Sequence, residues 1–193
     1  MKQYKLIYAD PPWWYNHRLN GHTRFGRGAG YYPLMKTTEI CTLPVRELAE
    51  DRAVLFLWAT FPTLQEAFKV IEAWGFRYST VAFTWIKLNP KSKSYFFGTG
   101  YCTKSNAEIC LLAWKGRPIK PATDTISSLI VSPRQSHSRK PDEARKRIEQ
   151  LYPSLSKIEL FARPITAMWP VAEGWNVWGN QIEEQNKSHY TNL

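Results

Sequence analysis

Four consecutive residues near the start of the chain combine groups that could activate a weak nucleophile. Asp10-Pro11-Pro12-Trp13 offers a carboxylate, carbonyl acceptors on a backbone stiffened by two prolines, and a flat aromatic ring. Such acceptors beside an aromatic plate suit a planar base that carries an amino group. Hydrogen bonds from that group to the Asp10 carboxylate and the Pro11 carbonyl would localise the nitrogen lone pair for in-line attack on an activated methyl group. An ordinary Asp-Pro turn is the alternative interpretation.

The elements that must position this segment can be predicted from hydropathy. Asp10 directly follows an apolar run over residues 5–9, which is typical of a strand buried on both faces of a parallel sheet. Apolar stripes of helical period predict a helix over 62–74 and a second one from Pro141. Alternating strands and helices predict an α/β fold with a mostly parallel sheet, whose carboxyl edge is the usual ligand-binding edge. Further strands are predicted over residues 53–59, 76–88, 106–114, 157–162 and 175–178.

The charge distribution points to a polyanionic partner. The 193-residue chain has a net charge of +10, and residues 87–147 hold thirteen basic against four acidic residues, or +9 of that total. Lysine and arginine that neutralise phosphates release counterions, so nucleic acid is the favoured partner; a solvated basic face is the alternative. The loop 89–105 mixes lysine with aromatic residues, as expected for backbone contacts plus base stacking or for a protein interface. We also expect residues 14–32 to form a lid.

Length and composition exclude several classes. A single catalytic domain is predicted over residues 1–182, with a polar tail over 183–193. No apolar run is long enough for a membrane span, so we expect no membrane association. Three cysteines without Cys-x-x-Cys spacing argue against a disulfide framework and a zinc site, so we predict no metal and a cytoplasmic location.

Three motifs occur in order along the chain. Asp10-Pro-Pro-Trp13 is followed by Ser138-Arg-Lys-Pro-Asp-Glu143, and then by Lys157-Ile-Glu-Leu-Phe-Ala-Arg163 with Trp178-Gly-Asn-Gln181. In these motifs the sequence resembles the adenine-N6 methyltransferases, which include eukaryotic messenger RNA adenosine methyltransferases and bacterial and phage DNA-modifying relatives. The resemblance covers nearly the whole chain. It implies a Rossmann-like methyltransferase fold with permuted motif order and S-adenosylmethionine as methyl donor.

The resemblance also implies roles for individual residues. Lys140 and Ser138 would meet the methionine carboxylate of the donor, Asp10 its amino group, and Glu159 the ribose hydroxyls. The alternatives are a solvated surface Lys140 and a Glu159 paired with Arg163. Phe161-Ala-Arg163 stands where many dinucleotide sites have a glycine-rich loop. The remaining expected cofactor contacts come from Phe161, Arg163, Asn180 and Gln181, of which the last two could instead simply end a strand.

These residues together predict methylation of the N6 amino group of adenine in DNA. The base would be extruded into a pocket over residues 10–13, stack on Trp13 and donate hydrogen bonds to Asp10 and Pro11. DNA is preferred over RNA because the chain shows no added RNA-binding module. An RNA adenosine-N6 methyltransferase and a non-catalytic nucleic-acid-binding subunit are the alternatives, and a homodimer that shares target recognition is a further expectation.

Overall fold

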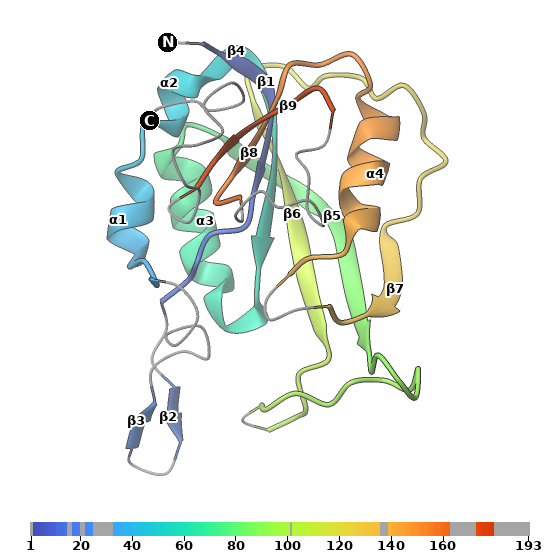
Figure 1. Ribbon diagram of the computed structural model, residues 1–193. Coiled ribbons are helices and arrows are strands. Elements are labelled where there is room, and N and C mark those ends of the chain that lie inside the picture. The colour runs from blue at the N-terminus through green and yellow to red at the C-terminus, as the bar shows by residue number, and fades with distance from the viewer. Residues whose placement is uncertain are drawn as a thin grey trace.

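A seven-stranded sheet in the order β7-β5-β6-β4-β1-β8-β9 forms the centre of the computed structural model (Figure 1). The structure describes residues 2–14, 17–19, 22–24, 33–100, 102–135, 139–162 and 173–179. Only β6 runs antiparallel to its neighbours, so the predicted mostly parallel α/β sheet is confirmed. The strands are β1 (Tyr4–Ala9), β4 (Ala49–Ala59), β5 (Arg77–Leu88), β6 (Ala107–Lys115), β7 (Leu129–Pro133), β8 (Lys157–Leu160) and β9 (Trp175–Trp178).

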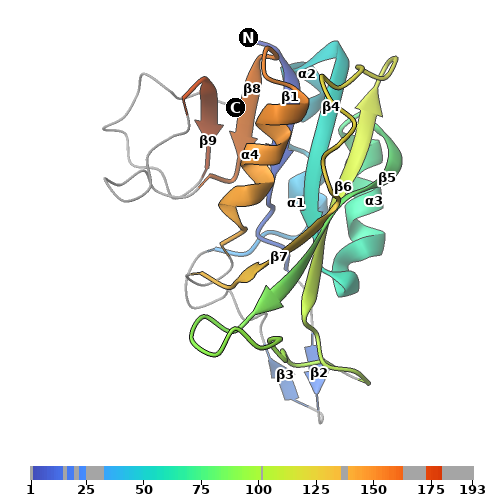
Figure 2. The same ribbon diagram turned by 90° about the vertical axis from the view of Figure 1, so that its right-hand side faces the viewer.

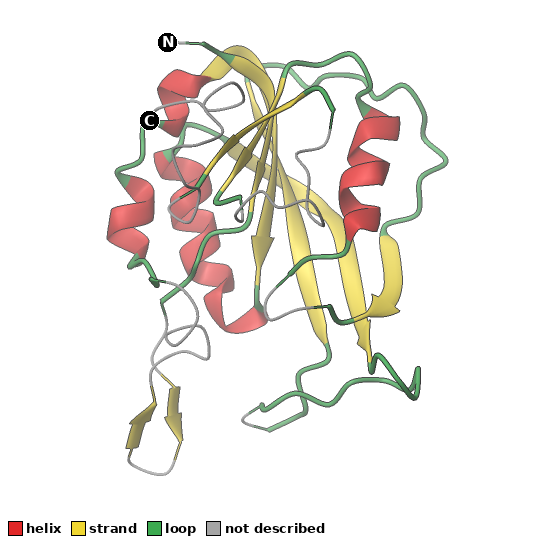
Figure 3. Cartoon of the chain, viewed as in Figure 1, coloured by secondary structure: helices red, strands yellow, loops and turns green. Residues whose placement is uncertain are grey.

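Helices cover both faces of this sheet, as Figures 2 and 3 show. Residues of β1 alternate between two cores, with Ile7 packed toward α3 and Leu6 toward α4. The buried stripe of α3 includes Ile71, and that of α4 includes Ile148, as their helical periodicity predicts. The helices are α1 (Thr37–Cys41), α2 (Val45–Leu48), α3 (Leu64–Ala73), which follows the 3₁₀ turn η1 (Phe61–Thr63), and α4 (Asp142–Leu151).

Several elements were not predicted from the sequence. The edge strand β7 is short and half exposed, and α1 and α2 are single turns stabilised by burial of Ile40, Val45 and Leu48 rather than by a long apolar stripe. In the segment expected to form a lid, the structure describes a small hairpin of β2 (His17–Leu19) and β3 (His22–Arg24). This hairpin and the β5–β6 loop project beyond the carboxyl ends of the sheet strands (Figure 1).

Among the described residues, no helix combines the length and apolar character needed to cross a bilayer. The polar segment 183–193 lies outside the described residues, so its expected role as a tail stays a prediction.

Candidate active site

Asp10 lies at the carboxyl edge of the sheet, directly after β1. β1 pairs in parallel with β4 on one side and with β8 on the other, and Ala9 is opposite Leu57 and Leu160. Because parallel strands end at the same edge, Asp10 is brought next to the residues that follow β4 and β8. The structure therefore places the Asp10 carboxylate where open α/β sheets bind their ligands.

Backbone hydrogen bonds fix the segment that follows. The Trp13 N–H donates to the Pro11 carbonyl at 2.9 Å, and the Met35 N–H donates to the Pro12 carbonyl at 2.8 Å. The Trp14 N–H in turn donates to the Met35 carbonyl at 2.9 Å. Both proline carbonyls thus already accept a hydrogen bond, although the sequence suggested open acceptors. A carbonyl oxygen has two lone pairs, so Pro11 retains one for a further donor.

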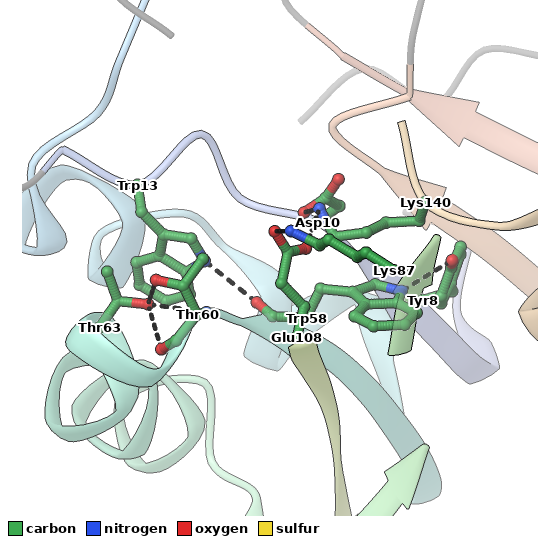
Figure 4. A network of polar contacts seen from close by, with 9 residues as sticks. All are labelled: Tyr8, Asp10, Trp13, Trp58, Thr60, Thr63, Lys87, Glu108 and Lys140. Carbon is green, nitrogen blue, oxygen red and sulfur yellow. Dashed lines mark hydrogen bonds and ion pairs between the residues drawn. The ribbon is translucent and has the colours of Figure 1, made fainter. Parts of the chain in front are cut away.

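Trp13 is a core residue. Only 7% of its surface is exposed, and its indole Nε1 donates to the Trp58 carbonyl at 3.0 Å. The Trp58 indole donates in turn to the Tyr8 hydroxyl at 2.8 Å (Figure 4). An adenine could stack on the Trp13 ring only after the surrounding segment moves, so the structure does not support the open stacking face that the sequence suggested. Burial of this large ring instead anchors the segment to β4.

Two lysines and two acidic residues alternate in a row at the same edge (Figure 4). The Lys140 Nζ lies 2.6 Å from Asp10 Oδ1 and 3.4 Å from Glu108 Oε2, and Lys87 contacts Glu108 Oε1. The side chains of Lys140, Glu108 and Lys87 are 12%, 14% and 14% exposed. Glu108 reaches this edge because β6 is antiparallel and its first residues lie beside the last residues of β4. Lys140 is therefore a partly buried residue of the site and not a solvated surface lysine.

The two lysines decide the charge of Glu108. Burial alone would raise its pKa, but the attraction of Lys140 and Lys87 outweighs this effect and lowers the pKa below the usual glutamate value. Glu108 Oε2 is nevertheless buried and makes no hydrogen bond within the described part of the chain. The Lys140 ammonium also lies 5.7 Å from the centre of the Trp58 ring, within cation–π range.

Glu159 extends the site along β8. Its Oε2 lies 2.8 Å from Nη2 of Arg145, which belongs to the second turn of α4. Burial raises the pKa of Glu159, and the charge of Arg145 offsets only part of that rise. The sequence suggested ribose hydroxyls or Arg163 as partners of Glu159. Among the described residues the partner is Arg145, while Arg163 lies outside them and the ribose contact stays a prediction. A carboxylate accepts several hydrogen bonds, so this ion pair leaves acceptor capacity on Glu159.

The end of β8 is shaped by a tight turn. Phe161 has a φ of 61°, so the predicted strand 157–162 ends at Leu160, and the Phe161 ring packs edge-on against Trp178 at 5.3 Å between centroids. The Ala162 N–H donates to the Trp178 carbonyl at 2.9 Å. A Cβ on Gly179 would lie 2.3 Å from the Ala162 carbonyl oxygen, so this crossing of two backbones requires glycine.

The loop between β5 and β6 displays aromatic rings beside lysines. Tyr95 and Phe97 are 58% and 67% exposed. Phe96 between them lies beneath the Arg134 guanidinium, whose carbon is 3.5 Å from the ring centre. Exposed rings next to cations form a surface on which nucleic acid bases can stack while the backbone phosphates are neutralised.

Comparisons with known proteins identify the family of the chain. The MT-A70 family model matches residues 4–181. The chain belongs to the MT-A70 family. It is 34% identical to the Type II methyltransferase M.MunI from Mycoplasma sp over 200 residues, which cover 95% of this chain and 79% of that protein.

Eukaryotic members of the MT-A70 family match as well. The chain is 32% identical over 179 residues to an N(6)-adenosine-methyltransferase MT-A70-like protein of Arabidopsis thaliana, covering 92% of this chain and 23% of the relative. It is 30% identical over 182 residues to the Homo sapiens N(6)-adenosine-methyltransferase catalytic subunit METTL3, covering 94% of this chain and 28% of the relative. The chain thus spans about a quarter of these longer proteins. The expected Rossmann-like methyltransferase fold is confirmed.

Part of the cofactor prediction for this MT-A70 domain falls outside the described residues. Asp10, Lys140, Glu159 and Phe161 gather around the carboxyl ends of β1 and β8. The contacts expected from the other four residues stay predictions, since the structure does not describe Ser138, Arg163, Asn180 and Gln181.

The basic segment of this MT-A70 domain is partly neutralised by its own chain. Lys140 forms an ion pair with Asp10, and Arg145 forms one with Glu159; both acids lie outside the segment. Three further cations of the segment pair with acidic residues within it. Fewer basic residues are therefore available to bind a polyanion than the number of basic residues in the sequence suggested. The cations of the segment that remain exposed among the described residues are Lys91, Lys93, Lys104, Arg117, Lys120 and Lys146.

Sequence reasoning did not identify three charged residues of this arrangement. Glu108, Lys87 and Arg145 belong to no motif and seemed part of ordinary strands and a helix face. One signal was present: Glu108 interrupts an apolar strand, as Glu159 does, and an acidic residue in such a run needs a partner.

Proposed function

We propose that this chain is an S-adenosylmethionine-dependent methyltransferase that modifies the N6 amino group of adenine in DNA. The observation that carries the proposal is the placement of the Asp10 carboxylate, with Lys140 at 2.6 Å, at the carboxyl end of β1. The relatives named N(6)-adenosine-methyltransferases support the N6 position. The Type II methyltransferase, most of whose length the chain spans, favours DNA as substrate over RNA.

The charges around Asp10 fit the methionine end of S-adenosylmethionine. That end carries an ammonium and a carboxylate, for which Asp10 and Lys140 provide the opposite charges. Glu159, one strand away, offers acceptor capacity to ribose hydroxyls. Phe161 turns the chain at the end of β8, beside Asp10. When bound, the donor supplies a methyl group attached to a positively charged sulfur.

The residues of the chain would prepare the adenine nitrogen for attack. The Asp10 carboxylate accepts one N6–H, and the remaining lone pair of the Pro11 carbonyl accepts the other, which localises the nitrogen lone pair. Positioning then contributes most of the rate, because no strong base is needed before the nitrogen gains positive charge. Asp10 is the nearest carboxylate to accept the proton released afterwards. The buried hydrogen bond from Trp13 to Trp58 keeps these acceptors in place.

Nucleic acid would be held by the β5–β6 loop, which projects beyond the same edge of the sheet (Figure 1). Tyr95 and Phe97 present exposed rings, and Lys91 and Lys93 present exposed charges. Binding through such contacts weakens steeply as salt concentration rises.

A labelling experiment tests the proposal. Radiolabelled methyl donor is supplied with double-stranded DNA, single-stranded DNA and RNA, using wild-type protein, Asp10→Asn and Glu50→Gln. Glu50→Gln is the control, because Glu50 forms an ion pair with Lys5 away from Asp10. We expect label in DNA as N6-methyladenine, a loss of about 100-fold or more in Asp10→Asn, and no change in the control. Label in RNA alone would show that RNA, and not DNA, is the substrate. Donor binding without labelling of any substrate would instead favour a non-catalytic subunit.

A further inference from the structure

Glu159 is an acidic residue within an apolar strand. Its neighbours along β8, Ile158 and Leu160, are fully buried, and Tyr8 lies opposite it in β1 with 4% of its surface exposed. The Glu159 side chain itself is 18% exposed. A carboxylate in such surroundings has lost most of its hydration, so it stays charged only where another group stabilises the charge.

Arg145 provides that stabilisation from α4. Its Nη2 lies 2.8 Å from Glu159 Oε2, and its own side chain is 27% exposed. Burial raises the pKa of Glu159, and the positive charge of Arg145 opposes this rise. Two acidic groups near Glu159, Asp10 and Asp142, repel its negative charge and raise its pKa further. Tyr8 stays neutral, because burial raises its pKa well above the usual tyrosine value.

Fold stability alone does not explain why this pair is present. Moving two charges out of water costs about as much as their attraction returns, so apolar side chains could join α4 to β8 equally well. The ion pair provides something that apolar side chains cannot, which is an ionised acceptor one residue before the end of β8. Asp10 follows the neighbouring strand β1 at the same edge, so this acceptor lies beside the site proposed for the methyl donor.

We propose that Arg145 is a positioning residue for the methyl donor, because it keeps Glu159 ionised and able to accept hydrogen bonds from the ribose hydroxyls. Arg145 acts through Glu159 and does not touch the donor. The proposal rests on the proposed function, in which Glu159 meets the ribose.

This role of Arg145 predicts how donor binding depends on pH. Protonated Glu159 is a poorer acceptor than the carboxylate, so donor affinity should fall as the pH drops through the pKa of Glu159. Removing Arg145 raises that pKa, so the fall begins at a higher pH. A rise of one pKa unit weakens binding by up to about 10-fold below both pKa values and leaves it unchanged well above them.

Calorimetric titration with S-adenosylhomocysteine, a stable analogue of the donor, measures this dependence between about pH 5 and pH 9. The proteins are wild type, Arg145→Met, Arg145→Lys and the control Lys69→Met, which removes the cation of an exposed ion pair on α3. We expect Arg145→Met to bind about 10-fold more weakly near pH 5 and to approach the wild type as the pH rises. Arg145→Lys should recover part of the loss, and Lys69→Met should match the wild type throughout. An equal loss at every pH, or no loss, would overturn the proposal.

A second background separates action through Glu159 from direct contact with the donor. Glu159→Gln leaves no carboxylate to support, so adding Arg145→Met should change the affinity by less than about 2-fold. A loss as large as in the wild-type background would show that Arg145 contacts the donor itself. Arg145→Gln replaces Arg145→Met in both backgrounds if circular dichroism shows that Arg145→Met does not fold.

The same titrations distinguish the two proposals. If the wild-type protein binds no S-adenosylhomocysteine, the proposed function fails and the role of Arg145 fails with it. If the wild type binds this analogue and Arg145→Met has the same pH profile, only the role of Arg145 fails.

Discussion

Replacing Tyr8 with phenylalanine would remove one hydroxyl from the hydrogen bonds behind the site. In the folded protein the Trp58 indole Nε1 donates to this hydroxyl at 2.8 Å, and Tyr8 and Trp58 are 4% and 0% exposed. The Trp58 carbonyl in turn accepts the hydrogen bond from Trp13, so the two contacts join β1, β4 and the segment after Asp10 (Figure 4). Tyr8→Phe leaves the ring and its packing in place and removes only the hydroxyl, and with it the acceptor of the Trp58 indole.

Most of the expected loss of stability comes from the Trp58 indole N–H, which is left without an acceptor. A buried N–H without an acceptor costs about 1 to 3 kcal/mol, whereas a net hydrogen bond contributes about 1 kcal/mol. Phenylalanine has nearly the shape of tyrosine, so almost no cavity forms. We therefore expect Tyr8→Phe to lower the free energy of unfolding by about 2 kcal/mol. For a chain of this length that loss corresponds to a fall in Tm of about 4 to 8 °C.

Urea unfolding followed by circular dichroism measures this loss. The matched control is Tyr78→Phe, because Tyr78 is 40% exposed and a change within about 0.5 kcal/mol is expected for such a residue. A double-mutant cycle with Trp58→Phe should show a coupling energy of at least about 1 kcal/mol. If Tyr8→Phe costs no more than Tyr78→Phe, the hydroxyl does not satisfy the Trp58 indole and the reasoning fails.

Three further predictions concern the other side chains and the backbone around the site. Gly179→Ala should cost about 1 to 3 kcal/mol in a thermal melt, because the new Cβ would lie 2.3 Å from the Ala162 carbonyl oxygen; an unchanged Tm would contradict this. Stability should fall as pH drops below about 4.3, because the lowered pKa of Glu108 means that the unfolded chain takes up the proton first. Glu108→Gln should flatten this acid limb, and an identical limb in the variant would refute the assignment. Arg145→Met should cost more stability near pH 8 than near pH 5. The pKa of Glu159 is already raised in the folded chain, and it rises further when the cation is removed. The folded variant therefore favours the protonated Glu159, and it loses stability when the pH is high enough to ionise this residue. Equal losses at the two pH values would show that Arg145 does not support the charge of Glu159.

Much of the fold can be predicted because the relevant forces are local. The apolar run over residues 5–9 places a buried strand directly before Asp10, and helical periodicity locates α3 and α4. Strand β7 could not be predicted because it is a short strand at the sheet edge. Its Leu129 and Val131 are exposed, so it lacks the pattern of a buried strand. Helices α1 and α2 could not be predicted because single turns depend on burial against the sheet.

The exposure of Trp13 shows a limit of motif reasoning. Its type suggests a plate for a base, but exposure depends on what packs around the ring, and here the core and the Trp58 carbonyl surround it. The partner of Glu159 could not be predicted from the sequence either, because Arg145 meets Glu159 only when α4 packs beside β8.

The sequence alone was enough to predict the candidate reactive segment 10–13, the strand end at which it lies, and the class of fold, since each prediction depends on residue type and local hydropathy. Tertiary structure alone decided which charges meet. Lys140 and Asp10 are 130 residues apart, and Glu108 joins them only because β6 runs antiparallel beside β4. Strand order and direction minimise the free energy of the whole chain, and local hydropathy does not encode them. The state of the proposed catalytic carboxylate is therefore a property of the folded sheet.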